Sequence, residues 1–189
     1  VQSAYIIAKK FPRNQHESYI NMMDACKRPG LADQAMYAYP RGGQLITGPS
    51  IRLAESMAQY WGNLDCGVRE ISQADGVSVA EAYAIDLQTN TRVSKIFHVR
   101  HERYTKRGFT ILKDPRDIYE LVANHGARRL RACILAIIPG DVTESAVAQC
   151  RKTLECSDVP IAEQVRNMVS AFDTLGVKVE HLEKKLGHN

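Results

Sequence analysis

Residues 66–101 read CGVREISQADGVSVAEAYAIDLQTNTRVSKIFHVRH, and this stretch decides the fold. Apolar and polar side chains alternate along it in short segments, which is the period of a β-strand with one buried face. Two turn sequences, Asp75-Gly76 and Thr89-Asn90, divide the stretch into three segments. The pattern therefore predicts a three-stranded antiparallel meander with strands over 66–72, 77–87 and 92–100.

The segments on either side of the meander carry helix and hairpin signals. Upstream, we expect a helix over 15–27, a hairpin of 36–40 and 44–47 around Gly42-Gly43, and a mostly buried helix over 51–61. Downstream, a polar loop over 102–113 leads to Asp114-Pro115, which begins a helix ending near Ile138. Short helices follow to the end of the chain. This order predicts an α+β fold in which the meander packs on the long helix.

Two parts of unequal size are expected. Residues 1–155 form the main domain, and residues 156–189 form a helical C-terminal segment behind a hinge at 156–160. In the second part an amphipathic stripe repeats at helical spacing. Its members are Val165, Met168, Val169, Phe172 and Leu175.

Composition excludes several classes of protein. The longest apolar run, 132–138, is far shorter than the roughly 20 residues that a membrane-spanning helix needs, so no membrane association is expected. Five cysteines make an odd number without a CxxC pair, which favours a reduced cytoplasm over a disulfide framework or a metal site. Cys133 and Cys150 lie on apolar helix stripes and are interpreted as buried packing residues. The net charge of +4 says little by itself, so its distribution matters more.

The densest positive region begins in the last predicted strand and continues through the loop after it. Its cations are Arg92, Lys95, Arg100, Arg103, Lys106, Arg107, Lys113 and Arg116. Aromatic residues are interleaved with them, and of these Tyr104 and Phe109 are the best stacking candidates, whereas Phe97 alternates with core positions. Cations contact phosphates and aromatic rings stack on exposed bases, so this mixture favours single-stranded nucleic acid. The alternative is a solvated sheet edge protected by charge.

A second basic cluster lies on the predicted long helix, in the sequence NHGARRLR at 124–131. Arg128 and Arg131 share one helical face with Asn124, and Arg129 lies between them. Arginine suits bidentate phosphate contacts, so these side chains are candidate DNA ligands. Ion pairs with Asp117, Glu120 or another element would explain the same cluster, and the residues alone fit either interpretation.

The sequence contains few motifs that are typical of enzymes. Arg41-Gly42-Gly43 is a hairpin turn rather than a phosphate loop, because GxxxxGK[ST] is absent, and Arg41 is a candidate DNA contact beside that turn. Neither HExxH nor GxSxG occurs, and among the acids only Glu81 invites attention as a nuclease residue. We therefore expect no catalytic residue, no bound metal and no cofactor. Any strand transfer would then run on binding energy instead of nucleotide hydrolysis.

Three motifs together resemble a group of phage proteins, the single-strand annealing recombination proteins of the broad RecT, Redβ and Erf class, which are related to eukaryotic annealing proteins. The motifs are YPRGGQLITGPSIRLAESMAQYWGN at 39–63, TNTRVSKIFHVRHERYTKRG at 89–108 and DPRDIYELVANHGARRLRACILAIIPGD at 114–141. The resemblance covers roughly residues 1–155.

The resemblance implies a curved sheet packed on a long helix, in a protein that forms a ring or filament with DNA in a basic groove. It implies that Arg128, Arg129 and Arg131 line this groove and that 100–107 form a loop or hairpin at its wall. It also implies that the C-terminal segment recruits a partner such as a phage exonuclease or a host single-strand-binding protein. The expected function is ATP-independent annealing of complementary DNA strands in the cytoplasm of a host bacterium. The alternatives are a protein that protects single strands without annealing them and a Mg²⁺-dependent phage nuclease.

Overall fold

The computed structural model describes residues 2–105, 108–155 and 160–186. Contacts divide the chain into two compact units, Val1–Leu154 and Glu155–Asn189, which we describe separately. The helices are α1 (Gln2–Lys10), α2 (Gln15–Cys26), α3 (Pro29–Gln34), α4 (Ile51–Trp61), α5 (Pro115–Ile137), α6 (Gly140–Glu155), α7 (Ile161–Thr174) and α8 (Val179–Leu186). The strands are β1 (Met36–Arg41), β2 (Gln44–Pro49), β3 (Leu64–Ala74), β4 (Val77–Asp86), β5 (Thr91–Arg100), β6 (Glu102–Thr105) and β7 (Gly108–Ile111).

The central sheet is the predicted meander, with antiparallel strands in the order β3-β4-β5. Its turns use residues that tolerate a positive φ: Asp75 and Gly76 between the first two strands, and Asn90 between the next two. β1 and β2 form a separate hairpin, and β6 and β7 form another. The α+β class, the meander and the long helix are confirmed.

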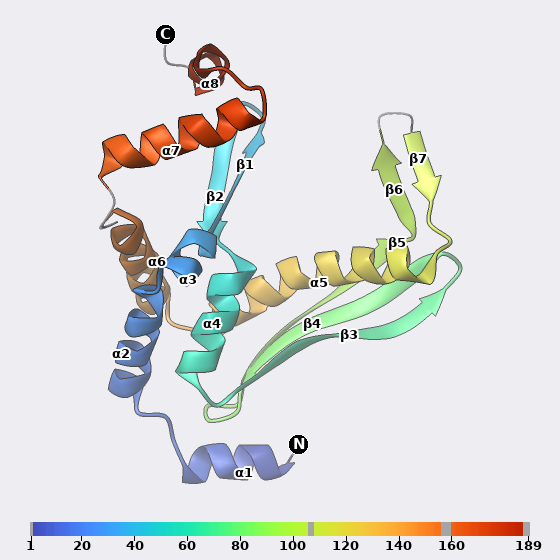
Figure 1. The fold of residues 1–189 in the computed structure, drawn as a ribbon. Helices are drawn as coiled ribbons and strands as arrows, with labels where there is room; N and C mark the ends of the chain where they lie inside the picture. The colour runs from blue at the N-terminus through green and yellow to red at the C-terminus, as the bar shows by residue number, and fades with distance from the viewer. Residues whose placement is uncertain (1, 106–107, 156–159, 187–189) are drawn as a thin grey trace. The chain divides into compact units, whose positions relative to one another are not determined.

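Helix α5 lies along one face of the meander (Figure 1). The central strand presents small side chains to it, since Ala80, Ala82 and Ala84 are fully buried. On the helix, a Cβ at Gly126 would come within 2.8 Å of a methyl group of Val68, so glycine permits the close approach of helix and sheet. The glycine of the NHGARR motif therefore serves packing.

The other end of α5 joins a helical core made with α2, α4 and α6. Its largest fully buried side chains include Met22, Leu53, Met57 and Ile134. Cys133 and Cys150 are buried in the same core, as their apolar stripes predict. Side-chain caps fix the starts of α2, α4 and α5; at the start of α4, Ser50 accepts a hydrogen bond from the backbone N–H of Leu53.

Two features differ from the sequence-based expectation. Residues 102–113 were expected to form a polar loop, but they contain the β6–β7 hairpin, because four-residue segments with mixed charge give too weak an alternation to indicate strands. The base of this hairpin is tied to the meander by a buried hydrogen bond of 2.8 Å between Ser78 Oγ and His101 Nε2. Helices α1 and α3 were also not predicted, since both are short and weakly patterned.

In the second unit, α7 and α8 form a small helical body of their own. The predicted stripe is present on α7 and remains open to solvent on most of its members. The exposed apolar residues are Ile161, Val165, Met168, Phe172 and Leu175. Across the ranges that the structure describes, no helix combines the length and the apolar character needed to cross a bilayer.

Candidate nucleic-acid interface

A depression of about 450 Å³ lies between the β1–β2 hairpin and α5, and we call it the Arg–Tyr depression. Its lining consists of Tyr37, Tyr39, Arg41, Arg128 and Arg131. The first three are alternate residues of β1, and alternate residues of a strand point to the same face. The two helical arginines are three residues apart and so share a face of α5. Local backbone geometry thus directs all five side chains to one place.

Aromatic contacts join the two elements. The Arg131 guanidinium lies over the Tyr37 ring, 4.3 Å from its centroid, and the rings of Tyr37 and Tyr39 stack with centroids 5.9 Å apart. Opposite Tyr37 on the neighbouring strand is Gly48, where a Cβ would come within 2.7 Å of the tyrosine hydroxyl. Glycine at this position leaves room for the ring.

The arginines of the depression have no acidic partner in the part of the chain that the structure describes. Among the described residues, no ion pair connects Arg41, Arg128 or Arg131 to a carboxylate. The alternative of ion pairs with Asp117 or Glu120 is wrong, since eight residues of helix already separate Glu120 from Arg128 by about 12 Å. Arg41 and Arg128 are exposed. The depression therefore presents uncompensated positive charge beside two aromatic rings.

Arg129 belongs to a different environment. Its guanidinium lies 4.6 Å from the centroid of the Phe97 ring, and it donates a hydrogen bond of 3.1 Å to the backbone carbonyl of His125. Phe97 is buried, as expected for a core residue. Arg129 thus packs on β5 and is not among the residues that line the depression.

His125 adds no positive charge to this surface. Burial lowers the pKa of its imidazole, and the neighbouring Arg129 and Arg128 lower it further. Its Nδ1 is buried without a hydrogen-bond partner among the described residues. The ring is therefore neutral at neutral pH, and the local charge comes from the arginines.

The fold places the cations of the predicted basic stretch in different environments. Arg92 pairs with Glu81 at 2.8 Å, together with Arg69 at 2.6 Å, and the Glu81 side chain is only 5% exposed. The hydrogen bond from Arg69 holds the pKa of the Glu81 carboxyl below its ordinary value against the opposing effect of burial, and hydrogen bonds from Arg92 and Ser94 act in the same direction. Glu81 is thus a carboxylate held by two arginines on the sheet.

The other cations of the stretch lie at exposed positions. Lys95 and Arg100 are on β5, an edge strand of the meander, and Arg103 is on β6. Lys106 and Arg107 lie outside the described residues. The cations named here that the structure describes are divided between β5 and β6, whereas Arg41, Arg128 and Arg131 line one depression.

Aromatic side chains are displayed on the β6–β7 hairpin. Tyr104 and Phe109 are directly opposite each other in the register and contact edge to face, with ring centroids 5.4 Å apart. They are 75% and 73% exposed, and Arg103 points to the other face of the same hairpin. Large aromatic side chains so open to solvent are typical of interaction sites.

Sequence reasoning missed the two tyrosines of the depression. The alternation of Tyr37, Tyr39 and Arg41 indicated a strand, but nothing in it showed that α5 would pass the same face. No group of three or more His, Cys, Asp or Glu side chains is placed to hold a metal ion within the described ranges.

Comparison with known proteins found no match. No family model matches the chain, and neither the curated proteins nor the solved structures contain a significant match.

Proposed function

We propose that this protein binds single-stranded DNA and anneals complementary strands without ATP, as a phage recombination protein. The observation that carries the proposal is the Arg–Tyr depression, where Arg41, Arg128 and Arg131 converge beside Tyr37 and Tyr39 and pair with no carboxylate of residues 2–105, 108–155 and 160–186. Arginine guanidinium groups are suited to phosphate oxygens, and tyrosine rings stack on bases of any sequence. Single strands offer both groups at once.

The β6–β7 hairpin supplies a second surface of the same chemistry. Tyr104 and Phe109 can stack on bases that have left the duplex, and Arg103 on the other face of the hairpin adds positive charge nearby. Lys95 and Arg100 on the edge strand add positive charge to opposite faces of the meander. Duplex DNA hides its base faces, so these aromatic residues favour single strands over double strands.

The proposed mechanism needs no covalent chemistry. One strand lies along the positive surface with its phosphates neutralised, which lowers the repulsion that a complementary strand meets. Base pairing and stacking in the new duplex then supply the driving force. The absence of GxxxxGK[ST] from the sequence agrees with a process driven by binding energy.

The wider setting is part of the proposal. The protein acts in the host bacterial cytoplasm as a homo-oligomer, a ring or a filament, because a single domain offers too short a track for a useful length of DNA. The open stripe of α7 fits the recruitment of a partner such as a phage exonuclease or a host single-strand-binding protein.

Equilibrium binding to fluorescent oligonucleotides at several salt concentrations tests the proposal. If about five phosphates are neutralised, log affinity falls against log salt with a slope of about −3.5. We expect tighter binding to single-stranded than to double-stranded DNA of equal length. Affinity that does not depend on salt would contradict the proposal, and cleavage of the oligonucleotide with Mg²⁺ would favour a nuclease instead.

A further inference from the structure

Helix α1 carries an apolar face that its own chain leaves open. Ile6, Ile7 and Phe11 are 66%, 56% and 64% exposed, whereas Ala8 on the opposite side is buried. Lys10 lies one turn after Ile6 on the open face, with its ammonium group 5.8 Å from the centroid of the Phe11 ring. The helix contains no acidic residue. Its open face is thus apolar and positive.

The chain just after α1 is fixed to one end of the meander. Asn63 donates a side-chain hydrogen bond of 3.1 Å to the carbonyl of Phe11. Arg13 forms a bidentate ion pair with Asp86 at 2.7 Å, and both side chains are only 6% exposed. Asp86 pairs with Leu64 at the start of β3. Helix α1 is therefore held at the end of the sheet where β3 begins, and Figure 1 shows it lying apart from α5.

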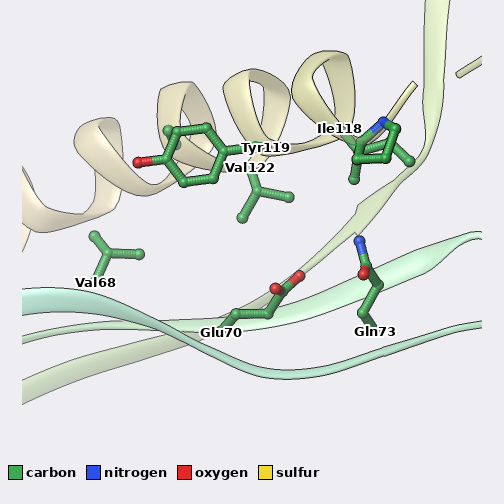
Figure 2. Close-up of a pocket in the computed structure, with 8 residues that line it drawn as sticks. Val68, Glu70, Gln73, Ile118, Tyr119 and Val122 are labelled. Atoms are coloured by element: carbon green, nitrogen blue, oxygen red, sulfur yellow. The ribbon is translucent and has the colours of Figure 1, made fainter. Parts of the chain in front are cut away.

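A groove of matching character lies farther along β3. Figure 2 shows it between this strand and the first turns of α5. The groove has a volume of about 310 Å³. Its apolar lining includes Val68, Ile118, Tyr119 and Val122, and Tyr119 is 70% exposed. Glu70 is the charged side chain among the described residues that line it. The groove is thus apolar and negative, and it borders a free sheet edge because β3 is an outer strand.

We propose that α1 of one copy of the chain docks in this groove of the next copy. The exposed apolar residues of helix and groove cover each other, and Lys10 reaches Glu70 at the rim. Because the two surfaces are different and lie at different places on one copy, the contact is head-to-tail. Head-to-tail contacts close into rings or extend into filaments. This contact rests on the proposed function, because it would join the copies of the proposed homo-oligomer. It can be tested without DNA.

Sedimentation of two single variants, alone and mixed, provides the test. Ile7→Asp changes the helix face and Tyr119→Asp changes the groove, both at exposed positions where the fold tolerates a charge. We expect each variant alone to associate at least tenfold more weakly than the unmodified chain. Mixed in equal amounts, they form a dimer and nothing larger, because only one intact helix and one intact groove meet. The matched control, Leu154→Asp at another exposed apolar position, associates normally.

A charge exchange gives the second arm, which does not depend on apolar substitutions. Lys10→Glu and Glu70→Lys each weaken association, and the double variant recovers it. The proposal is overturned by an unmodified chain that stays monomeric, as it would if α1 closed on its own groove. It is also overturned by single variants that associate normally, or by a mixture of the two variants that remains monomeric. Binding of an oligonucleotide of about 10 nucleotides, near the footprint of one small domain, is measured separately. A monomeric variant that still binds the oligonucleotide shows that DNA binding does not require the contact between copies. Failure of the contact can then be told apart from failure of the proposed function.

Discussion

Replacing Arg128 and Arg131 with alanine should weaken DNA binding while the fold persists. Neither side chain pairs with a carboxylate among the described residues, so no buried acid is left without a partner. Arg131 does lose its contact with the Tyr37 ring, which costs about 0.5–1 kcal/mol of folding stability. Two phosphate contacts are worth about 2 kcal/mol together, taking about 1 kcal/mol for the net contribution of a typical hydrogen bond. At about 1.4 kcal/mol per tenfold change, the expected loss is about 30-fold in affinity.

Fluorescence anisotropy with a labelled oligonucleotide measures this loss, and thermal melting of the same protein measures the fold. The salt slope should become shallower by about 1.4, since two phosphate contacts are removed from a single strand. The control is the double variant Lys27→Ala, Arg52→Ala, which removes the same charge from exposed positions elsewhere. A folded Arg128, Arg131 variant with normal affinity and slope would refute the assignment of the depression. A loss shared equally by the control would show only an effect of net charge.

Three further predictions concern the hairpin, the helix packing and the sheet. Replacing both Tyr104 and Phe109 with alanine should weaken binding of single-stranded DNA by about 1–3 kcal/mol for each base that loses its stacking partner. The melting temperature should change little, because both side chains are exposed. Unchanged affinity would exclude the hairpin from the interface. Gly126→Ala should lower the free energy of unfolding by about 1–3 kcal/mol in urea titrations, because the new methyl group overlaps Val68. The folded-state pKa of Glu81 is depressed, so the stability that this carboxylate contributes is present at neutral pH and is lost as the pH falls below about 4.5. The stability difference between the unmodified chain and Glu81→Gln should accordingly shrink on acidification, and a difference that stays constant in urea titrations from pH 7 to pH 3 would contradict the ion-pair account.

The parts of the fold that the sequence predicts are those specified locally. The meander follows from period-two alternation interrupted by Asp75-Gly76 and Thr89-Asn90, where Asp75, Gly76 and Asn90 adopt the positive φ that tight turns require. The long helix follows from Asp114-Pro115 as cap and first residue. The β6–β7 hairpin escapes prediction because its stability depends on contacts such as Ser78 with His101, which join residues distant in sequence.

The candidate site was less predictable for the same reason. Arg128 and Arg131 are recognisable from helical spacing, but their neighbours Tyr37 and Tyr39 are separated from them by most of the domain. Charge counting also treats all cations alike. Arg92 is bound to a buried carboxylate on the sheet, and only the cross-strand register reveals it.

Annealing of two complementary oligonucleotides, followed by fluorescence without nucleotide or metal, tests the central claim most directly. The account predicts that the protein accelerates annealing well above the spontaneous rate, that the acceleration falls as salt rises, and that ATP does not change it. Binding of single strands with annealing at or below the spontaneous rate would contradict the account and identify a protein that protects DNA instead.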